Sequence, residues 1–341
     1  METQLNLTKT ERLTLWNQKR FEAFLPTTIF LNFCAVVGLF GNGVVIYIYG
    51  LRLHAKNAGR YFIPYLAVAD LLALVISAEL HTVSNSTPVT YTFETFCKWN
   101  FVAALFVTVF SISILLIIAV QRYLKVCKPF GGQMTLFWRR FSLCLTFILT
   151  AGLVVPTYFT FGLENVYNKE LNVTGTACRR LTSTTQTLSL IHSATCTLLI
   201  LIGGIILIVL YTMVAKVIYR QNKQNLGDAN KKKTNISRMF IIITIIFFVS
   251  FLPRMITNIL EGIIVGMWEA RTIEEYAIVR FFELMYVVNH MANPLVYAFL
   301  DKKFVTEFKK VFCCKTVDSF QKEFSSGTKA NVSNMMTLEM E

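Results

Sequence analysis

Charged residues are scarce in this chain of 341 residues, because Asp, Glu, Lys and Arg make up only 16% of it while apolar residues make up 54%. A soluble domain ordinarily has about 25% charged residues. Histidine is rare too: His54, His81, His192 and His290 have no metal-ligand spacing, and no nucleophile stands with a base and an orienting residue. The composition therefore argues against a soluble domain, a metalloprotein and an enzyme.

Long apolar runs take the place of these charges. A helix needs about 20 mostly apolar residues to cross the hydrocarbon of a bilayer. Seven runs of that length occur, at residues 25–51, 61–84, 98–121, 138–162, 187–214, 238–266 and 276–300. The sequence predicts an all-α membrane protein, a bundle of seven transmembrane helices. It shows neither the internal repeats nor the paired broken helices that many transporters have.

The orientation follows from the short loops. Lys and Arg are concentrated after the first, third and fifth spans, and this asymmetry predicts that those loops are cytosolic. We therefore expect a multi-pass plasma-membrane protein with its N terminus outside. The net charge of +13 is explained by this asymmetry and by anionic lipid, so no nucleic-acid partner is expected.

The regions outside the bundle are also predicted. Residues 1–24 are polar, without cysteine or a signal-peptide core, and are expected to be a short extracellular tail rather than a folded hormone-binding domain, so the first span would act as the targeting signal. Residues 25–300 are expected to form the seven-helix bundle. Residues 301–314 include the amphipathic stretch DKKFVTEFKKVF, an expected eighth helix, and residues 315–341 are expected to be a disordered cytoplasmic tail.

Covalent modifications are expected on both sides of the membrane. Cys97 opens the third span, Cys178 lies in the next outer loop, and these are the only two cysteines on the oxidising side, so we expect them to form a disulfide. Sequons predict glycosylation, and two cysteines after the amphipathic stretch predict palmitoylation. The predicted sites are Asn6, Asn85 and Asn172 for glycans, and Cys313 and Cys314 for palmitate.

Short motifs mark several spans. These are GNGVV from Gly41 in the first, LAVAD at 66–70 in the second, AVQRYLKVCKP at 119–129 in the third, FFVSFLP at 247–253 in the sixth and NPLVYAFLDKKF at 293–304 in the seventh. With the paired outer cysteines, this ordered set resembles the rhodopsin-like (class A) family of G-protein-coupled receptors, of a neuropeptide type. The likeness runs from about residue 25 to residue 314.

Asp70 is a lone carboxylate in the second span, where a charge is costly unless it faces the bundle interior. The resemblance implies that Asp70, Ser111, Asn289 and Asn293, with Asn42 beside them, surround an allosteric sodium ion, the one cofactor expected. The alternative is a neutral, hydrogen-bonded carboxylic acid that only braces the helices. Both interpretations are open at this point.

The resemblance also implies a switch. The sixth span would bend at Pro253 and swing its cytosolic half outward, and Arg122 would contact a heterotrimeric G protein. The other residues of this set are Gln121, Tyr123, Tyr211, Phe247, Phe251, Pro294 and Tyr297. Gln121 stands where the family usually has an acid, which favours elevated basal activity. A receptor kinase and arrestin are further expected partners, acting on the tail.

The ligand class is narrowed by two absences. Ala104 stands where amine receptors have an aspartate, and residues 276–300 lack the lysine that retinal requires. Charged outer residues instead favour an extracellular peptide, with Glu79, Arg254, Asn258, Glu261 and Glu283 as the predicted ligand-binding residues. The alternatives are that Glu79, Glu283 and Arg254 pair only to brace the helices, or that the receptor senses a small molecule or lipid, or is constitutively active.

Overall fold

Long helices make up most of the chain. The computed structural model describes residues 7–53, 60–181, 185–223, 228–264, 267–268 and 271–312. The main helices are α1 (Lys9–Val45), α2 (Ile63–Ser86), α3 (Glu94–Cys127), α4 (Leu136–Val154), α6 (Gln186–Lys223) and α7 (Asp228–Ile263). A π-helical segment, η2 (Ile46–Arg52), prolongs α1. Within the described residues, six helical regions are long and apolar enough to cross a membrane.

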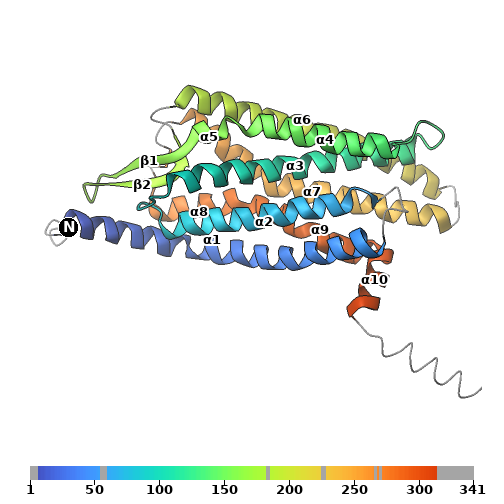
Figure 1. Cartoon of the computed structure of the whole chain (residues 1–341), viewed down its shortest axis with the longest axis horizontal. Helices are drawn as coiled ribbons and strands as arrows, with labels where there is room; N and C mark the ends of the chain where they lie inside the picture. Colours follow the sequence, from blue (N-terminus) through green and yellow to red (C-terminus); the bar gives the residue numbers. More distant parts are fainter. Residues whose placement is uncertain are drawn as a thin grey trace, which may run out of the picture.

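The seventh span is built from three consecutive pieces. These are α8 (Ile273–Glu283), the 3₁₀ turn η4 (Leu284–Tyr286) and α9 (Val287–Leu300). Together they cover the predicted run 276–300. The amphipathic helix α10 (Lys302–Phe312) follows directly and leaves the bundle axis (Figure 1). The predicted helical bundle with a short eighth helix is confirmed.

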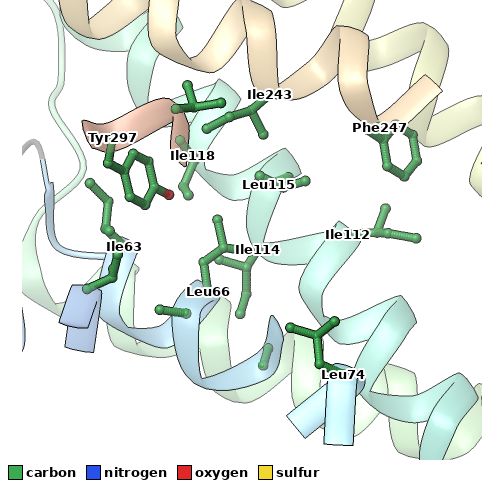
Figure 2. Close-up of a cluster of buried hydrophobic side chains, with 14 of the residues drawn as sticks. Ile63, Leu66, Leu74, Ile112, Ile114, Leu115, Ile118, Ile243, Phe247 and Tyr297 are labelled. Atoms are coloured by element: carbon green, nitrogen blue, oxygen red, sulfur yellow. The ribbon is translucent and has the colours of Figure 1, made fainter. Parts of the chain in front are cut away.

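The core of the bundle is formed around α3. Figure 2 shows side chains from α2, α3, α7 and α9 meeting there, among them Leu66, Ile114, Leu115, Ile118, Phe247 and Tyr297, each at most 2% exposed. Lipid is as apolar as these side chains, so close packing rather than escape from water holds the helices together. Single core residues therefore matter through their shape.

Two glycines of α1 allow close helix contact. A Cβ atom at Gly41 would lie 2.8 Å from Cβ of Pro294 in α9, and one at Gly38 would lie 2.2 Å from Leu74 Cδ1 in α2. The proline ring cannot move aside as a flexible side chain can. At Gly43, by contrast, nothing lies within 4 Å of such an atom. The GNGVV motif thus contains one glycine that packing requires and one that it does not.

A β-hairpin lies at one end of the bundle. The short helix α5 (Thr157–Thr160) leads into β1 (Phe161–Asn168), which pairs with antiparallel β2 (Val173–Arg180). The Cys97–Cys178 disulfide joins β2 to α3, as predicted. Sequence analysis gave no sign of the hairpin itself. Figure 1 shows it at one end of the molecule, beside the start of α1, with α10 at the other end.

The N-terminal segment differs from the predicted tail, because α1 already begins at Lys9. Thr8 and Glu11 form a capping box, a signal that was present in the sequence. The helix packs on the hairpin: Trp16 is 2% exposed in a cluster with Val166 and Val173. Arg12 Nη1 also donates to the Leu171 carbonyl at 3.0 Å. Residues 9–24 are therefore helical and part of the folded protein.

The predicted glycosylation sites differ in exposure. The Asn85 side chain is 2% exposed and its Nδ2 donates to Thr28 Oγ1 at 3.0 Å, which argues against a glycan on that nitrogen, and glycosylation there stays a prediction. Asn172 is exposed in the hairpin turn, where its φ is 46°, and it stays a prediction. Asn6, Cys313 and Cys314 lie outside the described residues.

Replacing Gly41 with Ala is expected to destabilise the protein by about 1–3 kcal/mol, because the new methyl group overpacks against Pro294. The matched change Gly43→Ala meets open space and is expected to be neutral or stabilising by up to about 1 kcal/mol, since Ala is the better helix former. The apparent unfolding temperature of the purified protein measures both. Equal shifts would refute the close α1–α9 contact.

Candidate functional site

A cavity lies between the helices beneath the hairpin, with about 830 Å³ of space including its opening. Aromatic rings and hydroxyl groups line much of it, and Ala104 lines it as well. Its charged lining residues are Arg180 from β2 and Arg254 from α7. A smaller neighbouring cavity, the vestibule, shares Arg180 and Arg254 with it and is also lined by Glu261, Arg280 and Glu283. The cavity combines apolar walls with a few polar groups, as small-ligand and peptide sites do.

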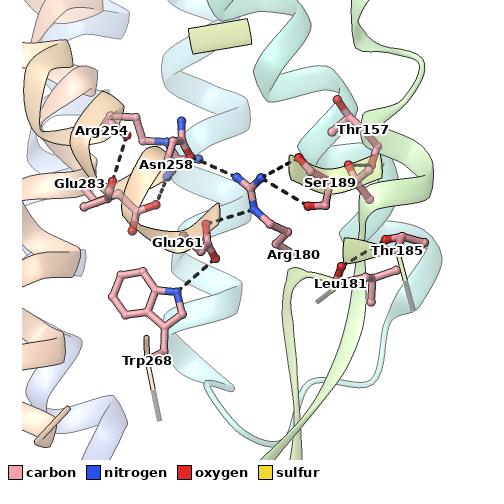
Figure 3. Close-up of polar contacts among 12 residues, drawn as sticks. Thr157, Arg180, Leu181, Thr185, Ser189, Arg254, Asn258, Glu261, Trp268 and Glu283 are labelled. Atoms are coloured by element: carbon pink, nitrogen blue, oxygen red, sulfur yellow. Dashed lines mark hydrogen bonds and ion pairs between the residues drawn. The ribbon is translucent and has the colours of Figure 1, made fainter. Parts of the chain in front are cut away.

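Arg180 joins three elements at the mouth of the cavity (Figure 3). Its Nε donates to Glu261 Oε2 at 3.1 Å, its Nη2 to Asn258 Oδ1 at 3.3 Å, and its Nη1 to the Ser189 carbonyl at 3.3 Å. The hairpin is thereby tied to α6 and α7. Arg180 lies two residues after the disulfide cysteine, and the sequence analysis did not select it.

A second charged cluster connects α7 to α8. Arg254 donates to Glu283, which also accepts from Arg280 Nη1 at 3.2 Å. The two guanidinium groups therefore share one carboxylate. Trp268 Nε1 meanwhile donates to Glu261 at 3.1 Å. These contacts stabilise positions that a charged ligand would also recognise.

The predicted ligand residues are partly brought together. Arg254 and Asn258 line the cavity, while Glu261 and Glu283 border the vestibule. Arg254 also pairs with Glu283, as the bracing interpretation expected. Glu79 differs from the prediction, because it is exposed on α2 and borders neither of these two cavities.

A chain of polar contacts leads inward from this mouth. Arg280 Nη2 lies 3.1 Å from His81 Nδ1, and Arg can only donate, so Nδ1 accepts and Nε2 carries the imidazole proton. His81 Nε2 then donates to the Tyr286 hydroxyl at 3.2 Å, which donates to Ser77 Oγ at 3.1 Å. Hydrogen bonds thus connect the charged cluster to Tyr286.

Aromatic rings continue the path toward the bundle centre. The Phe251 ring centroid lies 5.8 Å from that of Tyr286, 6.3 Å from that of His290 and 4.8 Å from that of Phe247. Phe247 and Phe251 are both buried, and Pro253 lies two residues further along α7. The predicted hinge region is therefore in contact with the cavity through Phe251, which lines it.

Asp70 is fully buried and hydrogen-bonded to three side chains. Its Oδ1 accepts from Ser111 Oγ at 2.6 Å and lies 2.8 Å from His290 Nδ1, and its Oδ2 accepts from Asn293 Nδ2 at 2.5 Å. Ser111 and Asn293 were predicted partners. His290 was missed, although it precedes Asn293 by three residues and so shares its helix face. Asn289 makes no hydrogen bond with the described residues.

The remaining predicted switch residues gather toward the α10 end of the bundle. Gln121 and Arg122 are buried in α3, and Tyr211 and Tyr297 lie within electrostatic reach of the Arg122 guanidinium. Tyr123 packs against a small cluster of Val126, Val214 and Ile218. Pro294 lies inside α9, against Gly41.

A buried ion pair that sequence analysis missed joins helices at the α10 end of the bundle. Arg60 donates two hydrogen bonds to the Asp301 carboxylate, of 2.7 and 2.9 Å, and the Tyr49 hydroxyl donates to the same carboxylate at 2.7 Å. Burial raises the pKa of Asp301, but Arg60 and Tyr49 overcome this and lower it below its ordinary value. Asp301 also accepts from the Lys303 amide, so it caps α10.

A family of known proteins matches most of this chain. The family described as "7 transmembrane receptor (rhodopsin family)" matches residues 41–297, which include the Asp70 cluster and the aromatic path. The chain belongs to the rhodopsin family of seven-transmembrane receptors. Members of this family are receptors and not enzymes. The receptor is accordingly a multi-pass plasma-membrane protein.

Individual relatives are distant. The receptor is 24% identical to "Rhodopsin, GQ-coupled" of Mizuhopecten yessoensis over 84% of this chain and 60% of that protein. It is 25% identical to "Tachykinin-like peptides receptor 86C" of Drosophila melanogaster over 94% of this chain and 65% of that protein. It is 24% identical to "Neuromedin-U receptor 2" of Rattus norvegicus over 90% of this chain and 80% of that protein. The receptor thus spans less than two thirds of the length of the first two.

Replacing Asp301 with Ala is expected to cost about 3–5 kcal/mol of stability, because Arg60, only 9% exposed, would be left as an uncompensated buried charge. Glu307→Gln on α10 is the matched control. Its partners Arg52 and Lys310 are 42% and 59% exposed, so that change is expected to cost about 0–1 kcal/mol. Thermal unfolding of the purified receptor compares the two, and similar losses would disprove the role of the buried pair.

Proposed function

We propose that this protein is a receptor for an extracellular peptide and that it activates a heterotrimeric G protein. The observation that carries the proposal is the cavity beneath the disulfide-anchored hairpin, from which continuous contacts lead to Phe251 and Asp70. Tachykinin-like and neuromedin-U receptors among its relatives support a peptide ligand. A small organic or lipid ligand is the second candidate, because much of the cavity wall is apolar and aromatic.

The disulfide supports one orientation in the membrane. Disulfides persist in the oxidising extracellular space, which favours the hairpin end as the outer end. Arg12 of α1 bonds to this hairpin, which brings the start of α1 to the same side. We infer that the N terminus is outside and that α10 lies at the inner leaflet, where palmitoylation of Cys313 and Cys314 would anchor it.

The cavity favours a ligand with an anionic group. Its described charged lining residues are two arginines, Arg180 and Arg254, and no carboxylate is among them. A peptide carboxylate entering between them would compete with Glu283 for Arg254 and with Glu261 for Arg180. Such charge-assisted hydrogen bonds are worth about 1.5–3 kcal/mol each.

Ligand binding would act on α7 through Arg254. This residue follows Pro253, where the missing backbone donor weakens the helix and makes a hinge. Releasing Arg254 from Glu283 would shift Tyr286 and Phe251, which touch each other, and let the cytosolic half of α7 swing outward. Arg122 and Tyr123 would then contact the G protein, and a receptor kinase and arrestin would act on the phosphorylated tail.

Arg254→Gln is expected to lower peptide potency at least tenfold, because it removes one charge-assisted hydrogen bond of about 1.5–3 kcal/mol. The measurement is G-protein activation in cells, with a peptide library prepared both as free acids and as C-terminal amides. Free acids are expected to act more strongly. Lys169→Gln removes the same charge from the exposed hairpin turn and is expected to leave potency unchanged.

Three results would contradict parts of this proposal. Equal responses to acids and amides would refute the anionic group while leaving the peptide receptor intact. Responses only to apolar carboxylates would favour the lipid-sensing alternative. Strong signalling that no ligand alters would favour a constitutively active receptor.

A further inference from the structure

Asp70 has nearly exhausted its capacity to bind a cation. A carboxylate offers about four lone-pair directions. Three are taken here, because Oδ1 faces both Ser111 and His290, and Oδ2 accepts from Asn293. Asp70, Ser111 and His290 are each 0% exposed and Asn293 is 1% exposed, so water does not compete for these hydrogen bonds.

The imidazole is the element that excludes a metal ion. An ionised carboxylate only accepts, so with Asp70 ionised, as a sodium ligand must be, His290 Nδ1 carries the proton. That N–H points at the oxygen that a sodium ion would need, and an N–H group repels a cation. Hard cations require oxygen ligands on every side. The donor set therefore does not fit the sodium ion that the family resemblance implies.

His290 is held firmly in this position. Its ring lies between Asp70 and the rings of Phe251 and Tyr286, whose centroids are 6.3 and 6.4 Å away. Its own carbonyl accepts from Asn42 Nδ2 at 3.0 Å, which connects α9 to α1. Leaving Asp70 for another rotamer would break the packing around Phe251.

We propose that His290 occupies the place of the sodium ion, as a ligand of Asp70 that is covalently attached to the seventh span. The receptor is then indifferent to sodium, since its central carboxylate is satisfied by the chain itself. Because His290 also touches Phe251, the hold on Asp70 is coupled directly to the hinge region of α7. This inference goes beyond the proposed function and does not depend on any ligand being known.

The test uses the full-length receptor in lipid nanodiscs and sodium itself as the probe. Its apparent unfolding temperature is compared in NaCl and in N-methylglucamine chloride, both at about 0.15 M ionic strength. The wild type is expected to unfold at the same temperature in both salts. His290→Ser removes the N–H group and supplies an oxygen, and it is expected to gain a sodium-specific stabilisation of a few degrees.

Controls make each outcome decisive. The double variant His290→Ser with Asp70→Asn is expected to lose the sodium effect, because the charged ligand is gone. A sodium-specific shift in the wild type that Asp70→Asn abolishes would overturn the proposal. So would a folded His290→Ser variant that ignores sodium. If that variant does not fold, ²³Na relaxation on the wild type decides alone: Asp70-dependent sodium binding overturns the proposal and its absence supports it.

Discussion

Hydrocarbon cannot solvate a polar group, and the interior of this bundle is arranged around that constraint. Asp70 is the strictest case, since an unpartnered carboxylate near the bilayer centre costs several kcal/mol. Asp70 lies in α2, and its three partners come from α3 and α9, so the packing of these helices is fixed by this meeting point. At the α10 end of the bundle, Asp301 plays the same part for Arg60 and Tyr49. The polar clusters thus fix the relative positions of helices whose apolar surfaces alone would pack in many ways.

Because the buried polar groups must satisfy one another, the contacts that stabilise the bundle are also the contacts that would transmit a signal. His81, Tyr286 and His290 satisfy one another's polar groups or lie ring against ring along one line from the mouth to the centre. A displacement at Arg280 or Arg254 cannot be absorbed locally, because each member has a neighbour that must move with it. Coupling across the bundle needs no special pathway beyond these mutual requirements.

The helices could be predicted from the sequence, but the side-chain partners of Asp70 and Arg60 could be predicted only in part. Apolar runs located the seven spans, because the length needed to cross a bilayer is fixed, and motifs located Arg122, Asn293 and Tyr297. The hairpin escaped notice since β1 and β2 are too short and too polar to stand out in a helical chain. Asp301 and His290 escaped for another reason: their importance depends on Arg60 and Asp70, which are distant in sequence. Glu79 was selected for its charge, and only the rotation of α2 shows that it faces away from the cavity.

The first part of α1, residues 9–24, constrains the order in which this receptor folds during synthesis. Trp16 packs against Val166 and Val173, which are synthesised about 150 residues later. During translation the N-terminal segment is therefore without its binding surface until the fourth span has been inserted and the hairpin has formed. Exchanging this segment with that of a relative would leave the hairpin surface without its counterpart.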